Sequence, residues 1–239
     1  MLAIFNREMR SYFTTSIGYI FLACSLVVSA LIFSITTIFS STADTGTYFA
    51  GLIFVLMVFL PVLTMKTFSE EKKTKTEQLL LTAPVSTTQM VLGKFFSAFA
   101  MLAIFLTASS LFILPLNLYT ANDASGPNAA LVMGNIFALL LVGMCFIAIG
   151  IFVSSLTENQ FAAIVVTVVI LLILMLVSLF GAMINVYAIR VILNWLSIYT
   201  RYEAFTYGIF DIGALIYYLS LAGVFIFLTV RVFESRKYN

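Results

Sequence analysis

The sequence predicts an all-α polytopic membrane protein: six transmembrane helices, an N-terminal interfacial amphipathic helix and a helical elbow on the cytoplasmic side. Of its 239 residues, 62% are hydrophobic and 9% are charged, whereas soluble domains contain about 25% charged residues. So few charges cannot cover a soluble fold of this length, so the composition excludes an ordinary soluble enzyme, a disordered chain and a nucleic-acid-binding protein. The chain has 2 cysteines and 0 histidines, so we expect neither a disulfide scaffold nor a metal site.

Six uncharged stretches are long enough to cross a bilayer, whose apolar core of about 30 Å requires roughly 20 helical residues. We expect the transmembrane helices at 17–39, 48–65, 95–118, 130–153, 161–184 and 212–230, all within one domain that spans 1–239. The connections are too short to form a separate soluble domain.

The charges predict the orientation of these spans. Of the 12 basic residues, only Arg190 and Arg201 lie on the side opposite the others. Cytoplasmic loops carry the excess of lysine and arginine in membrane proteins. We therefore expect both termini in the cytoplasm, which agrees with an even number of spans.

Residues 1–14, before the first span, have the pattern of an amphipathic helix. One face is apolar and the other carries Arg7 and Arg10; the apolar positions are Leu2, Phe5, Met9, Tyr12 and Phe13. Such a helix lies in the membrane interface with its basic residues toward lipid head groups. The alternative is a frayed terminus.

The connection at 69–93 predicts a helix, a proline turn and a second helix. Ser69 is placed to cap the first helix, with Glu70 and Glu71 in the first turn, where the helix dipole favours acidic residues. That helix ends in three leucines at 79–81, before Pro84, because the residue preceding a proline avoids the helical region. Three leucines outside the membrane must be buried by the protein's own helices or by a partner.

The second helix of the elbow starts at a capping box formed by Ser86 and Gln89 and is expected to continue without a break to about Leu114. Lys94 lies at the membrane boundary of this helix, so we expect its side chain to snorkel toward water.

Two further connections carry chemistry. Glu158 is the one charge in the short turn between the fourth and fifth spans, which is either a plain hairpin or a second, smaller cytoplasmic contact point. Aromatic residues recur at helical spacing in 185–211, as expected for the membrane interface. This segment either lies flat on the bilayer or re-enters the bundle.

Several signals of energy-coupling chemistry are missing from the sequence. The spans contain no ionisable side chain, which ion-coupled carriers and proton pumps normally need. The Gly93–Lys94 pair lacks the glycine and hydroxyl residue of a phosphate-binding loop, and no nucleophile–base pair occurs. We therefore expect no enzymatic activity in this chain and a motor in a separate subunit.

The chain resembles an ABC-2-type transporter permease subunit over essentially its whole length, closest to the gliding-motility-type and nitrous-oxide-maturation-type permeases. The motifs that carry the resemblance are Glu-Glu at 70–71, Thr-Glu-Gln-Leu-Leu at 76–80, Ala-Pro-Val-Ser at 83–86, Leu-Gly-Lys at 92–94, Tyr-Glu-Ala-Phe at 202–205 and Gly-Ile-Phe-Asp at 208–211. Lys75 departs from the pattern, because many relatives carry glycine there.

The resemblance implies that 69–93 is a cytoplasmic coupling elbow that docks on an ATPase. The implied ATPase-coupling residues are Glu70, Glu71, Thr76, Glu77, Leu79, Leu80, Pro84 and Glu158. The implied extracytoplasmic gate lies in 185–211 and contains Trp195, Tyr199, Tyr202, Glu203 and Phe205.

The resemblance also implies the partners. They are a cytoplasmic ABC ATPase dimer that binds ATP and Mg²⁺, a second permease subunit, identical or different, and membrane lipid, with room for an extracytoplasmic auxiliary protein. No cofactor is expected in this chain and no nucleic acid among its partners, and the location is the bacterial cytoplasmic (inner) membrane.

Three functions fit these expectations. The first is an ATP-driven exporter, whose apolar spans favour an amphipathic or lipid-like substrate. The others are a passive channel or secondary carrier that works without an ATPase, and a membrane scaffold that transmits ATPase-driven motion to an extracytoplasmic partner. Polar residues within the spans, such as Asn135, either line a path or form hydrogen bonds between helices.

Overall fold

The computed structural model describes residues 1–39, 45–75, 86–119, 128–183 and 186–238. Every secondary-structure element in these ranges is a helix. Six helices are long and apolar enough to cross a membrane: Ser16–Ile38, Gly46–Lys73, Thr87–Leu116, Ala129–Leu156, Gln160–Val177 and Ile212–Arg236. The predicted fold class, an all-α polytopic membrane protein, is therefore confirmed.

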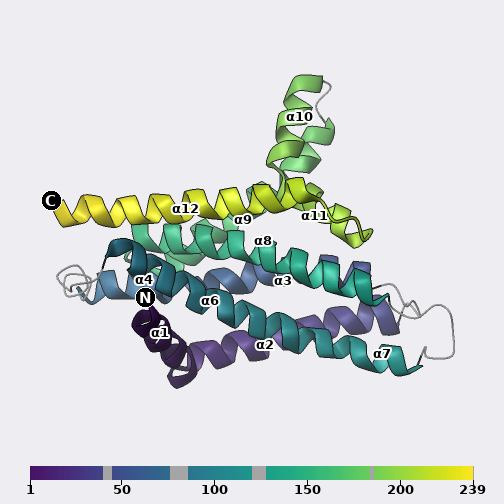
Figure 1. Ribbon diagram of the computed structural model, residues 1–239, viewed down its shortest axis with the longest axis horizontal. Coiled ribbons are helices and arrows are strands. Elements are labelled where there is room, and N and C mark those ends of the chain that lie inside the picture. The colour runs from purple at the N-terminus through teal and green to yellow at the C-terminus, as the bar shows by residue number, and fades with distance from the viewer. Residues whose placement is uncertain (40–44, 76–85, 120–127, 184–185, 239) are drawn as a thin grey trace.

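The long helices run side by side along the molecule, and both chain ends lie toward the end of the bundle that carries α4 (Figure 1). The first and second spans are α2 (Ser16–Phe33), extended by the π-helical turn η1 (Ser34–Ile38), and α3 (Gly46–Thr64), followed by α4 (Lys66–Lys73). The fourth, fifth and sixth are α8 (Ala129–Leu156), α9 (Gln160–Met183) and α12 (Ile212–Tyr238).

The third span is not the unbroken helix that we expected. It consists of α6 (Thr87–Ser110), a 3₁₀ turn η2 (Leu111–Ile113) and α7 (Leu114–Tyr119). Pro115 explains the break, because a proline cannot donate to the carbonyl four residues before it and its ring clashes with that carbonyl. The start is as predicted, since the Ser86 hydroxyl accepts the N–H of Gln89 at 3.3 Å.

Helix α8 is the centre of the bundle. In its apolar stretch 72% of the residues are buried, compared with 28% in the stretches of α2, α9 and α12. Gly143 and Gly150 let its neighbours approach: a Cβ atom would lie 2.4 Å from Leu102 of α6 at the first and 2.2 Å from the Thr64 hydroxyl of α3 at the second. Small residues at such crossings allow helix backbones to pack closely within a membrane.

The first helix of the elbow differs from the prediction. Helix α4 continues α3 after a break of one residue at Met65, so Ser69 lies inside a helix and does not cap one. Its buried hydroxyl donates back to the Met65 carbonyl. No proline or glycine separates the apolar span from the charged segment, so the helix propagates from one into the other.

At the N-terminus, α1 (Leu2–Thr14) is the helix predicted within 1–14. Thr15 has an extended backbone, with φ −94° and ψ 154°, and turns the chain from α1 into α2. Gly18 is required at this corner, because a Cβ atom there would lie 2.3 Å from the Tyr12 carbonyl oxygen.

The predicted aromatic segment 185–211 contains two helices, α10 (Tyr187–Leu196) and α11 (Ile198–Thr206). Ser197 separates them and caps α11, because its hydroxyl accepts the N–H of Thr200 at 3.3 Å. Helix α11 contacts α8, α9 and α3, whereas α10 contacts α9 and projects away from the long helices (Figure 1).

Candidate functional site

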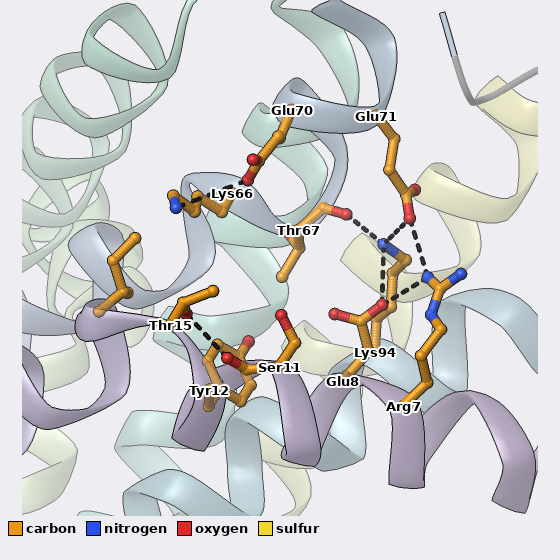
Figure 2. A pocket seen from close by; sticks show the side chains of 11 residues that line it. Arg7, Glu8, Ser11, Tyr12, Thr15, Lys66, Thr67, Glu70, Glu71 and Lys94 are labelled. Carbon is orange, nitrogen blue, oxygen red and sulfur yellow. Dashed lines mark hydrogen bonds and ion pairs between the residues drawn. The ribbon is translucent and has the colours of Figure 1, made fainter. Parts of the chain in front are cut away.

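Four charged side chains from three helices meet at the end of the bundle that carries α4. Figure 2 shows Arg7 and Glu8 of α1, Glu71 of α4 and Lys94 of α6 converging on one another. We call these four residues the charge cluster.

Lys94 is the buried member of the charge cluster, with a side chain that is 1% exposed. Its Nζ lies 2.8 Å from Glu71 Oε1 and 3.5 Å from Glu8 Oε1. It also donates to the Thr67 carbonyl oxygen and lies 4.6 Å from the centre of the Phe68 ring. The ammonium thus has one carbonyl acceptor and two carboxylate ion-pair partners.

Arg7 completes the charge cluster from the more exposed side. Its guanidinium lies 2.6 Å from Glu8 Oε1 and 3.0 Å from Glu71 Oε1. Burial disfavours the charged guanidinium, but the carboxylates of Glu8 and Glu71 outweigh this effect and raise the pKa of Arg7 above its usual value. Each of these two carboxylates therefore serves both cations.

The charge cluster corrects two predictions. Lys94 does not snorkel toward water, because two carboxylates within the protein compensate the burial of its charge. Arg7 is not directed only toward lipid head groups, because it binds Glu71 of α4. No local sequence pattern indicates this arrangement, since Arg7 and Glu71 are 64 positions apart.

A cavity of about 290 Å³ lies beside the charge cluster, between α1 and α4. Its lining also includes Lys66 and Glu70, whose Nζ and Oε2 atoms are 3.7 Å apart on one helix. The Glu70 side chain is 48% exposed at this site, compared with 16% for Glu71. Of Glu70 and Glu71, the two predicted elbow acids among the described residues, Glu70 is the more accessible, while Glu71 is held within the protein.

The end of α8 anchors α4 through Ser154. The buried hydroxyl of Ser154 accepts the backbone N–H groups of Phe68 and Ser69, each at 3.2 Å, and donates to the Met65 carbonyl at 3.0 Å. One side chain of the central helix thereby fixes the junction between α3 and α4. A lone serine at the end of an apolar helix carries no sequence signal for this role.

The turn between α8 and α9 lies against α4. Glu158 Oε1 is 3.5 Å from Lys72 Nζ, which also donates to the Leu156 carbonyl at 3.4 Å. A cavity of about 400 Å³ next to this pair is lined by Lys73, Glu158, Asn159, Gln160 and Phe161. The structure therefore joins this turn and α4 into one surface, which we call the α4–turn surface.

Only part of the predicted coupling set can be placed. Glu70, Glu71 and Glu158 lie in the arrangement above. The other members, Thr76, Glu77, Leu79, Leu80 and Pro84, lie outside the described residues.

The predicted gate residues separate into two groups at the opposite end of the bundle. Tyr202 and Phe205 of α11 are buried, and Tyr199 is half-buried. The Tyr202 hydroxyl donates to Asn135 Oδ1 of α8 at 2.9 Å, so Asn135 forms a hydrogen bond between helices. Trp195 of α10 is 63% exposed, and Glu203 is exposed.

Arg201, which the sequence interpretation did not select, connects this region. Its guanidinium lies 4.5 Å from the centre of the Tyr217 ring and 5.3 Å from that of Trp195. It also donates to the Trp195 carbonyl oxygen at 3.3 Å. A guanidinium between two aromatic faces is a stabilising contact that ties α10 to α11 and α12.

Among the described residues, no group of three or more histidine, cysteine, aspartate or glutamate side chains is placed to hold a metal ion. A protein-family model described as "ABC-2 family transporter protein" matches residues 61–237, which is more than half of the chain. The match begins in α3 and includes α4, Lys94, α10 and α11, but it does not include α1. A search of curated proteins finds no match.

Proposed function

Because this chain belongs to the ABC-2 transporter family and is a membrane permease subunit of an ABC transporter, we propose that it exports an amphipathic or lipid-like substrate. Separate cytoplasmic ATPase subunits, which bind ATP and Mg²⁺, supply the energy. In this proposal the permease works as a dimer with an identical or different second subunit, in a bacterial inner membrane and with both termini in the cytoplasm. It is closest to the gliding-motility and nitrous-oxide-maturation subtypes.

The observation that carries the proposal is the continuation of the second span into α4. Gly46–Lys73 is a helical stretch of 28 residues, which at 1.5 Å per residue reaches about 42 Å, beyond an apolar core of about 30 Å. Its far end carries charged residues and is held by Ser154 and the charge cluster. A partner that pushes on α4 therefore acts on α3, α8 and α6 together.

The α4–turn surface is the docking face in this proposal. It offers Glu158, whose side chain is 65% exposed, beside Lys73 and the exposed ring of Phe161. Besides Glu158 of the turn, Glu70 of α4 provides a second accessible carboxylate. Charged groups around an apolar centre are the usual composition of a protein interface.

The outer end of the bundle supports a gate at α11. Tyr202 and Phe205 close the space against α8, and the single hydrogen bond between Tyr202 and Asn135 can be broken at modest cost. The lipid-like substrate follows from the predicted spans, which offer apolar surface and no ionisable group to a charged solute. The exposed end of α10 leaves room for an auxiliary protein outside the membrane.

Co-purification followed by transport in vesicles tests the proposal. The tagged chain is purified together with the ABC ATPase that associates with it, reconstituted into proteoliposomes, and assayed for ATP-dependent translocation of a fluorescent phospholipid. We expect Glu158→Lys combined with Glu70→Lys to abolish ATPase association, whereas Glu203→Lys at the other end of the bundle leaves association intact.

Three results would overturn the proposal. Flux that does not require ATP would identify a channel or a secondary carrier. ATP hydrolysis without translocation would favour a scaffold. Normal ATPase association of the double variant would remove the α4–turn surface from the docking face.

A further inference from the structure

The charge cluster joins a helix that the family match does not include to two helices that it does include. Glu8 and Arg7 belong to α1, Glu71 to α4 and Lys94 to α6. The matched segment starts at residue 61, so α1 lies outside the family match.

Lys94 is the member of the charge cluster that joins all three helices, since it lies on α6 and has partners on α4 and α1, while Arg7 also joins α1 to α4 directly. The Lys94 ammonium donates to the Thr67 carbonyl of α4 and forms ion pairs with Glu71 of α4 and Glu8 of α1. A buried ammonium cannot exchange these partners for water, so separating the helices would leave an uncompensated charge in the interior. Helices α1 and α6 also pack closely next to Lys94, because a Cβ atom at Gly93 would lie 3.0 Å from Ile4 of α1.

We propose that Lys94 is a positioning residue that makes α1, α4 and the first turns of α6 move as one body. A displacement of α4 by the ATPase is then passed directly to α1, the helix at the membrane surface. The inference about transmission rests on the proposed function. The mechanical link itself does not, because it concerns this chain alone.

The same cavity offers a matched control. Lys66 and Glu70 form an ion pair of the same chemical types, 3.7 Å apart and four residues apart on α4. Their side chains are 30% and 48% exposed. Because both partners belong to one helix, removing this pair cannot loosen α1 from α4.

A distance measurement on the full chain tests the link. Cys24 and Cys145 are replaced by alanine, and spin labels are attached at the exposed positions Asn6 of α1 and Lys73 of α4. In proteoliposomes, we expect one narrow distance distribution for the wild type, for Lys66→Met and for Lys94→Arg. Lys94→Met should give a broad or shifted distribution, because the ammonium that joins the helices is lost.

Glu8→Gln provides a second variant that does not depend on the folding of Lys94→Met. It keeps the contact between Lys94 and Glu71 and neutralises only the α1 carboxylate, so it should also broaden the distribution. A distribution that stays narrow in both Lys94→Met and Glu8→Gln would refute the link.

Transmission is measured in the complex with the ATPase. We expect Lys94→Met to keep ATPase association but to lower the translocation rate per ATP hydrolysed roughly tenfold, within the 5–150-fold range of typical coupling between sites. Lys94→Arg should restore it and Lys66→Met should not change it. Unchanged translocation in Lys94→Met, alongside a broadened distance, would refute transmission through α1. A wild-type complex that fails to transport would instead contradict the proposed function and leave the distance result standing.

Discussion

Gly150→Ala is expected to separate the central helix from the second span. The added methyl group would lie 2.2 Å from the Thr64 hydroxyl oxygen and 3.0 Å from Thr64 Cβ, well inside ordinary contact distances. Thr64 is itself fixed, because its hydroxyl donates to the Leu60 carbonyl at 3.1 Å. The helices must therefore move apart, and overpacking of a closed contact costs about 1–3 kcal/mol.

The free energy of unfolding in mixed detergent micelles measures this cost. Thr64→Ala removes the atom that collides, so the double variant Gly150→Ala/Thr64→Ala should be more stable than the sum of the two single effects predicts. A coupling of about 1 kcal/mol is expected for residues in direct contact. Additive single effects, or a Gly150→Ala protein as stable as the wild type, would refute the close approach of α3 and α8 from which the position of α4 is argued.

Three further predictions concern the end of the bundle that carries α11. Tyr202→Phe should lower the free energy of unfolding by about 0.6 kcal/mol, the average for a polar pair between membrane helices, and should speed translocation if the gate opens there. Adding Asn135→Leu to Tyr202→Phe should lower the free energy of unfolding little further, and fully additive losses would argue against the Tyr202–Asn135 hydrogen bond. Gly208 has φ +75°, so Gly208→Ala should cost about 1–2 kcal/mol by the same unfolding assay, and an unchanged stability would contradict that backbone conformation. Arg201→Gln removes the cation between the rings of Trp195 and Tyr217. The emission maximum of Trp195, the single tryptophan of the chain, should therefore shift as the indole becomes more mobile. An unchanged emission spectrum would exclude the contact between Arg201 and Trp195.

The spans were predictable from the sequence because their signal is local. A stretch of about 20 apolar residues has few alternatives to a membrane helix, and the cap at Ser86 depends on a residue three positions away. The ends of the helices were less predictable. Ser69 has the residue type and neighbours of a cap, but α4 starts earlier, at Lys66, because no proline or glycine lies between the span and the elbow.

The candidate site was harder to predict because its contacts are distant in the sequence. The contact of Glu71 with Arg7 joins positions 64 apart, and that of Ser154 with Phe68 joins positions 86 apart. A lone lysine at the membrane boundary normally reaches water, so the sequence predicts that the Lys94 side chain snorkels. Lys94 can be buried because Glu8 of α1 and Glu71 of α4 pair with it. No sequence pattern within α6 predicts these two partners.

The continuity of α3 and α4 also has a consequence in the opposite direction. If the stretch Gly46–Lys73 tilts by about 10° as one rod of about 42 Å, its tip moves by about 7 Å. The same displacement can start within the bundle. A molecule that changes the tilt of α3 would then move α4 and the proposed docking face, the α4–turn surface. Free-energy coupling between two sites is reciprocal. In the proposed function, cargo in the bundle should therefore change the affinity for the ATPase by the same factor as the ATPase changes the affinity for cargo.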